Sequence, residues 1–130
     1  MKDRIVKEWF ERGKHDFLTA KLIFSQAGYY EEVIFLLHQA VEKYLKGYLI
    51  WYGWEPRKIH DIETLLTEII EFDKGFEKYL DLGRRLTGYY YEERYPPGPI
   101  PEILDEEVED TFKLAEEIIN LIKSKVSVGE

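Results

Sequence analysis

The sequence contains no cysteine and a single methionine among its 130 residues. Without thiols the chain can form neither a disulfide framework nor a thiolate nucleophile or metal ligand. This absence is typical of proteins in a reducing compartment, so we expect a cytoplasmic protein. The many Glu and Lys residues, together with so few oxidisable ones, also favour a heat-stable, thermophilic source.

The chain also lacks a long apolar run, and its N-terminal segment is charged throughout. Neither a membrane span nor a signal peptide is predicted. The formal net charge of −8 argues against extended, sequence-independent nucleic-acid binding, which needs a surplus of Lys and Arg to displace counterions. Much of the acidity lies at the start of the last predicted helix, where it complements the helix dipole.

Metal and nucleophile signatures are missing as well. The three histidines, His15, His38 and His60, stand singly and not at the His-x-x-x-His spacing of helical metal ligands. No serine has an evident base, and there is no glycine-rich phosphate loop. We therefore predict no metal site, no cofactor and no catalytic residue of these types.

Helical periodicity dominates what is present, most clearly between Phe35 and Trp51. Large and small apolar residues repeat there in steps of three and four, which predicts a central bundle helix with neighbours on more than one side. Ala40 and Gly47 on this arc would allow a second helix to approach closely. His38 is expected at the margin of the arc, one turn from Glu42. The predicted arc is Leu37, Ala40, Val41, Tyr44, Leu45, Tyr48, Leu49 and Tyr52, and the polar side is Gln39, Glu42, Lys43 and Lys46.

Similar patterns predict helices before and after this one. The first should run from about Asp3 to Gln26, with Ile5 on its buried side and a half-buried ion pair between Arg12 and Asp16. Asp61 is a good N-cap for a third helix. A fourth begins near residue 76, prolines make residues 89–101 irregular, and a long last helix follows. The expected fold is a single domain over residues 1–130, an all-α up-and-down antiparallel bundle of about five helices.

Basic and aromatic residues interleave between residues 84 and 95, in a segment that contains Arg84, Arg85, Arg94 and a run of tyrosines. Arginine offers bidentate donors for phosphate, and tyrosine rings offer stacking surfaces for bases, which would suit a nucleotide site. With Lys43 and Lys46 on the central helix, these arginines are the candidate nucleotide contacts. The alternative is that the tyrosine run packs one end of the bundle or a dimer interface.

The sequence resembles the HEPN family, the "higher eukaryotes and prokaryotes nucleotide-binding" domains. The resemblance is carried by HQAVEKYLKGYL from His38 to Leu49, by His60-Asp-Ile, by Trp9 with the Asp16-Phe-Leu-Thr-Ala segment, by Gly28-Tyr-Tyr and by Arg94-Tyr-Pro. It implies a helical bundle, a homodimer, and nucleotide or partner binding, often beside a minimal nucleotidyltransferase as in toxin–antitoxin pairs.

Many HEPN proteins are metal-independent ribonucleases whose signature is an arginine followed after four to six residues by a histidine. No arginine here is followed by a histidine at that interval, and tyrosine stands where the histidine would follow Arg84 or Arg85. A phenol with a pKa of about 10 is a poor general acid or base at neutral pH. We expect a non-catalytic nucleotide-binding or partner-binding module. The alternatives are a divergent ribonuclease and a purely structural dimeric adaptor.

Overall fold

The structure is a computed structural model, and it describes residues 2–26, 28–55, 61–86 and 103–126. Three long helices are α1 (Lys2–Gln26), α2 (Tyr30–Trp51) and α5 (Asp105–Lys125). A shorter helix is α3 (Ile62–Ile70), and η1 (Lys74–Tyr79) is a 3₁₀ turn that continues as α-helix over residues 80–86. No strand occurs among the described residues, and the predicted all-α bundle is confirmed.

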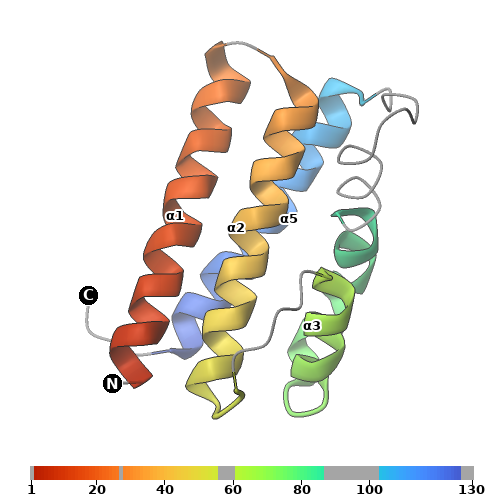
Figure 1. The fold of residues 1–130 in the computed structure, drawn as a ribbon. Coiled ribbons are helices and arrows are strands. Elements are labelled where there is room, and N and C mark those ends of the chain that lie inside the picture. The colour runs from red at the N-terminus through yellow and green to blue at the C-terminus, as the bar shows by residue number, and fades with distance from the viewer. Residues whose placement is uncertain (1, 27, 56–60, 87–102, 127–130) are drawn as a thin grey trace.

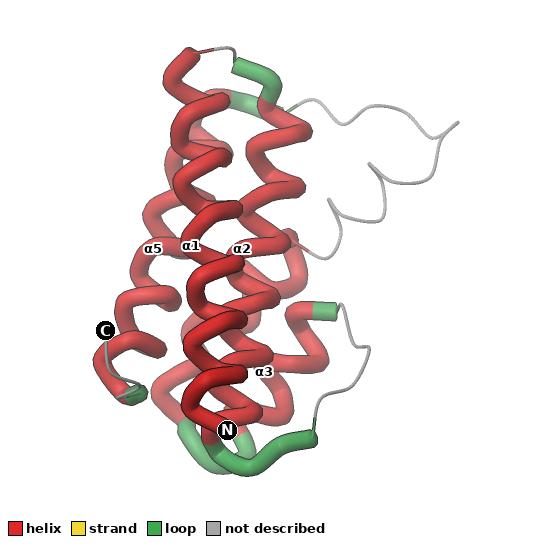
Figure 2. The backbone as a smooth tube through the Cα atoms, turned by 60° about the vertical axis from the view of Figure 1, so that its left-hand side comes forward, coloured by secondary structure: helices red, strands yellow, loops and turns green. Residues whose placement is uncertain are grey.

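The helices run in two directions along the bundle. α1 and α2 form an antiparallel hairpin, whereas α3 and α5 run in the same direction as α2 (Figure 1). Seen after a turn of 60°, the three long helices extend side by side along the molecule (Figure 2). The carboxyl ends of α2 and α3 therefore lie at the same end of the bundle.

Close contact between α1 and α2 depends on two glycines, as the Ala40 and Gly47 spacing predicted. A Cβ atom on Gly47 would lie 2.6 Å from a ring atom of Phe10, and one on Gly13 would lie 2.8 Å from the ring of Tyr44. Real Cβ atoms do not approach other atoms so closely, so a side chain at either position would push the helices apart. The rings of Phe10 and Tyr44 stack with centroids 5.1 Å apart in the space that the glycines leave.

The helix caps and the buried face of α1 agree only in part with the sequence predictions. Asp61 caps α3 by accepting from the Glu63 N–H at 3.0 Å, as expected. The fourth helix begins as a 3₁₀ turn, because the Asp73 side chain caps the Gly75 N–H and tightens the first turn. Ile5 was expected inside, but it is exposed and its neighbour Val6 is buried instead. The predicted irregular segment 89–101 lies outside the described residues.

None of the helices in the described part of the chain has the length and apolar character that crossing a bilayer requires.

Candidate functional site

A row of ionisable side chains runs along α2 on consecutive turns. His38, Glu42 and Lys46 are 1%, 4% and 4% exposed. Lys46 Nζ lies 2.8 Å from Glu42 Oε2, and His38 Nδ1 lies 3.7 Å from Glu42 Oε1. The carboxylate thus stands between two side chains that carry or can carry positive charge.

This row lies deeper in the bundle than the sequence pattern predicted. His38 was expected at the margin of the apolar arc, and Glu42 and Lys46 on the polar side, but all three are inside. The i, i+4, i+8 spacing was visible in the sequence and is the signal that could have found the row, since paired charges tolerate burial and single ones do not. Trp9 of α1 adds its ring face to Lys46, whose Nζ lies 5.5 Å from the ring centroid.

Lys43, one of the candidate nucleotide contacts, joins α2 to α1. Its ammonium donates to Asp16 Oδ2, and both side chains are mostly buried. The predicted Arg12–Asp16 pair is therefore wrong: Arg12 pairs instead with Glu8 at 3.3 Å on the exposed face of α1. The ion pair with Lys43 compensates Asp16 for the water that it loses at the contact between the two helices.

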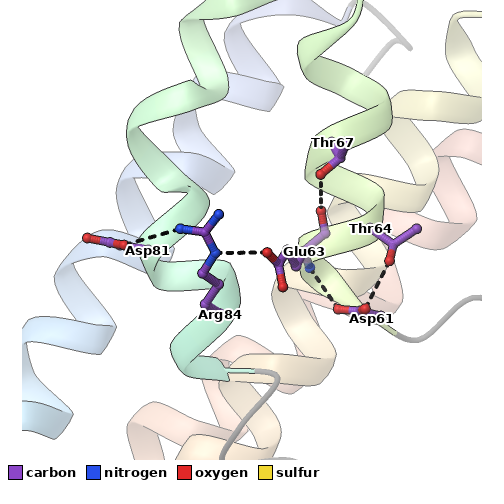
Figure 3. Close-up of polar contacts among 6 residues, drawn as sticks. All are labelled: Asp61, Glu63, Thr64, Thr67, Asp81 and Arg84. Carbon is purple, nitrogen blue, oxygen red and sulfur yellow. Dashed lines mark hydrogen bonds and ion pairs between the residues drawn. The ribbon is translucent and has the colours of Figure 1, made fainter.

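Arg84 lies at the surface of the helical segment 80–86 and points toward α3 (Figure 3). Its Nε donates to Glu63 Oε2 at 2.8 Å, and its Nη1 lies 3.8 Å from Asp81. The hydrogen bond to the Glu63 carboxylate raises the pKa of Arg84 above its ordinary value. Asp61, which caps α3, also accepts from Thr64 in the same view.

Arg85 points toward α5 rather than toward α3. Two of its guanidinium nitrogens donate to Asp110 Oδ2, each at 3.2 Å. Adjacent arginines therefore connect one helical segment to two different neighbours. Arg94, the tyrosine run and His60 lie outside the described residues.

The four candidate cations that the structure describes do not form one cluster through their contacts. Lys43 and Lys46 pair with carboxylates of α1 and α2, whereas Arg84 and Arg85 pair with carboxylates of α3 and α5. A phosphate would have to displace a carboxylate at each of these four residues. At these four residues the geometry therefore favours ion pairs within the protein over the binding of a phosphate.

The described histidines also face carboxylates. His15 Nε2 lies 3.7 Å from Glu11 on the exposed side of α1, and His38 faces Glu42 inside. Residues 2–26, 28–55, 61–86 and 103–126 contain no group of three or more His, Asp or Glu residues able to hold a metal ion.

A small all-α bundle whose central helix carries a buried row of charges is the class of protein that these features define. The HEPN domain family model matches residues 6–125, and the chain therefore belongs to the HEPN family. No curated protein matches it.

Two solved structures are similar over nearly their whole length. TT1696 from Thermus thermophilus is 26% identical, with 93% of this chain and 98% of that chain covered and a TM-score of 0.79. ST0689, described as an archaeal HEPN homologue, is 27% identical, with 94% and 98% covered and a TM-score of 0.74. The predicted family is confirmed.

Proposed function

We propose that this protein is a non-catalytic HEPN module that forms a homodimer and acts by binding a minimal nucleotidyltransferase, as in a toxin–antitoxin pair. The observation that carries the non-catalytic part is the pairing of the described cations. Each described candidate Lys or Arg contacts a carboxylate at 3.2 Å or less, and His15 and His38 face glutamates, not arginines.

Ribonuclease chemistry needs a group that takes the proton of the 2′-hydroxyl and a cation that stabilises the charge of the transition state. The sequence lacks the Arg-x(4–6)-His signature that would supply both. The test is incubation of purified protein with transfer RNA. We expect no cleavage, and cleavage that disappears in an Arg85→Ala variant would overturn the proposal.

The outer face of α1 supports a dimer with a second copy of this chain. Leu18 and Leu22, one turn apart on the same face of α1, are about half exposed or more. Apolar side chains spaced along one helix are a common basis of a C2 interface, in which each helix packs on its own copy.

Light scattering tests the dimer directly. We expect a species of twice the 15.6 kDa protomer mass at micromolar concentration and a monomer after Leu18→Glu with Leu22→Glu. Leu104→Glu is a matched control, because Leu104 is equally exposed but lies just before α5. A wild-type protein that stays monomeric would contradict the dimer. Co-elution with a nucleotidyltransferase encoded by the neighbouring reading frame tests the partner.

Nucleotide binding is the second candidate, and the exposure of the two arginines favours it. The side chains of Arg84 and Arg85 are 59% and 37% exposed, and ion pairs at the surface stabilise weakly, so a phosphate could compete with Glu63 and Asp110 there. Calorimetric titration of ATP and GTP tests this function. Binding that weakens with salt and in Arg85→Ala supports it, and no binding at millimolar nucleotide leaves the partner-binding role alone.

A further inference from the structure

A pocket of about 520 Å³ opens at the end of the bundle where α2 and α3 both terminate. This volume falls in the range of pockets that hold small organic ligands, about 300 to 1,000 Å³. The residues after the end of α2 form one wall and the last turn of α3 forms the other. Its lining includes Leu49, Tyr52, Trp54, Glu68, Glu71 and Phe72.

Two aromatic rings face solvent at this pocket. Tyr52 and Phe72 are 52% and 45% exposed, and their ring centroids lie 4.4 Å apart. Both rings pack on the fully buried Tyr48, at 5.1 Å and 6.0 Å, so the core holds them in place while they remain exposed to water. Tyr52 was predicted within the apolar arc of α2. It is exposed because α2 ends at Trp51 and the chain turns at Gly53, whose φ is +102°.

The electrostatic character of the pocket is negative. Among the described residues its lining includes the carboxylates of Glu68 and Glu71 and no Lys, Arg or His. The carboxyl end of α3 adds to this field, since a helix carries partial negative charge at that end. α3 has no basic residue in its last turn to balance it, whereas the ammonium of Lys2 does so at the carboxyl end of α2. On the side toward α1, Lys2 donates to the Trp51 carbonyl at 2.8 Å.

We propose that this pocket binds an organic cation, a guanidinium or alkylammonium group, held by the rings of Tyr52 and Phe72 and by the exposed carboxylate of Glu71. The aromatic rings attract a weakly hydrated cation, and the carboxylate supplies the opposite charge. An anion such as a nucleotide phosphate meets two carboxylates and the carboxyl end of α3 here. The site is therefore separate from the arginines and from the face of α1, and its test is independent of the proposed function.

The experiment compares choline with its neutral carbon isostere, in which a tert-butyl group replaces trimethylammonium. The two probes have the same shape, so a difference between them measures recognition of charge. The readout is the amide spectrum of isotopically labelled protein, followed at residues 49–54 and 67–72. We expect shifts there that saturate with choline at millimolar concentration and only weak, unsaturated shifts with the isostere. Equal responses to both probes, or none, would overturn the proposal.

Two variants locate the site. Glu71→Gln removes one charge and Phe72→Leu removes one ring, and both positions are exposed, so the fold should be retained. Each should weaken choline binding at least about threefold. Glu77→Gln is the matched control, because Glu77 is an exposed glutamate on η1 outside the pocket lining, and it should leave binding unchanged. Unchanged melting temperatures would exclude unfolding as the cause, and unaltered choline affinity in both variants would contradict the site.

The same assay distinguishes the source of the cation. N-acetylagmatine represents a free small molecule, and an acetylated and amidated arginine tripeptide, which carries the same single positive charge, represents a side chain presented by a protein partner. Tighter binding of the tripeptide assigns the pocket to a partner's arginine, and tighter binding of N-acetylagmatine assigns it to a free cation. Saturation by ATP at these residues, with no response to either cation, would sink the proposal.

Discussion

In its middle the central helix α2 buries the charged row of His38, Glu42 and Lys46, whereas near its carboxyl end Tyr48 packs against other aromatic rings. In the first region each charge depends on a partner, because a buried charge without one costs several kcal/mol. In the second, the ring of Tyr48 packs on those of Phe72 and Phe76, with centroids 6.0 Å and 5.3 Å apart. In the first region, removal of one charged partner should destabilise the fold strongly, because the other charge is left buried. In the second, the loss of stability should grow with the ring contacts removed.

The two regions also use charge differently. At the aromatic end, an ion pair between Asp73 and Lys125 lies at the edge of the ring cluster. Tyr48 donates to Asp73 Oδ2 at 2.9 Å, and Lys125 of α5 donates to the same oxygen at 2.8 Å. The pair connects the end of α2 to the start of η1 and the end of α5. The comparison predicts that removal of a charge matters most in the middle of α2.

The largest effect is expected for Glu42→Ala. The variant leaves Lys46 and His38 buried beside an empty space, and breaking a buried pair in this way costs about 3 to 5 kcal/mol. Urea denaturation of wild type and variant measures the free energy of unfolding. Glu8→Ala is the control, since the exposed Glu8–Arg12 pair is the same i, i+4 arrangement and should contribute less than about 1 kcal/mol.

A second variant separates loss of pairing from loss of volume. Replacing the whole row, with His38→Leu, Glu42→Leu and Lys46→Met, removes all the charges together and should give a stability close to that of the wild type or above it. If Glu42→Ala cost no more than Glu8→Ala, the buried row would be solvated and the contrast between the two regions would fail.

Tyr48→Phe should have the next largest effect, at the aromatic end. The ring stays and its packing is kept, but the hydroxyl no longer donates to the Asp73 carboxylate, a loss of about 1.5 to 3 kcal/mol for a hydrogen bond to a charged group. The measurement is again urea denaturation. Tyr29→Phe controls for the loss of a hydroxyl, because Tyr29 is exposed, makes no capping hydrogen bond with its side chain and should change stability little.

A smaller effect, specific to pH, is expected for Asp73. Its burial opposes ionisation, but hydrogen bonds from Lys125, Tyr48 and the Gly75 N–H together lower its pKa below the ordinary value. A carboxyl whose folded pKa is lowered stabilises the fold fully above its unfolded pKa of about 3.9, and this contribution is lost as pH falls through the folded pKa. Asp73→Asn should therefore be less stable than the wild type at pH 7, with the difference shrinking in acid. A difference that stays constant from neutral to strongly acidic pH would show that Asp73 is not the titrating group.

Much of the fold could be predicted from the sequence because its signals are local. Apolar steps of three and four, the Asp61 cap and the glycine at position 47 each act within one helix or one close contact. The HEPN family was likewise recognisable, since its motif letters keep their order along the chain. Direction was harder to predict: α3 runs parallel to α2, and no short-range pattern specifies where a connecting segment leads.

The candidate site was less predictable because pairing depends on neighbouring helices. Periodicity placed Lys43 and Lys46 on a polar side, and composition suggested a phosphate site near Arg84 and Arg85. Which carboxylate each one meets is decided by how α1, α3 and α5 pack, and the sequence carries no direct signal of that. Asp16 illustrates the difficulty, because it had a suitable arginine one turn away on its own helix and paired with Lys43 across the helix contact.

The smallest effect on stability is expected for Arg85→Ala, and it completes the comparison with the buried row. The Arg85–Asp110 pair is partly exposed, and pairs of this kind contribute at most about 1 kcal/mol. If phosphates also bind there, the variant should weaken ATP binding far more than it lowers the melting temperature. Asp110→Asn provides the matched test: it removes the competing carboxylate, so it should lose the same stability and strengthen phosphate binding. Calorimetric titration and melting curves on the same samples give both quantities. If the two variants lose stability equally and neither changes an interaction with nucleotide, Arg85 serves only to hold residues 80–86 against α5, and nucleotide binding by this arginine is excluded.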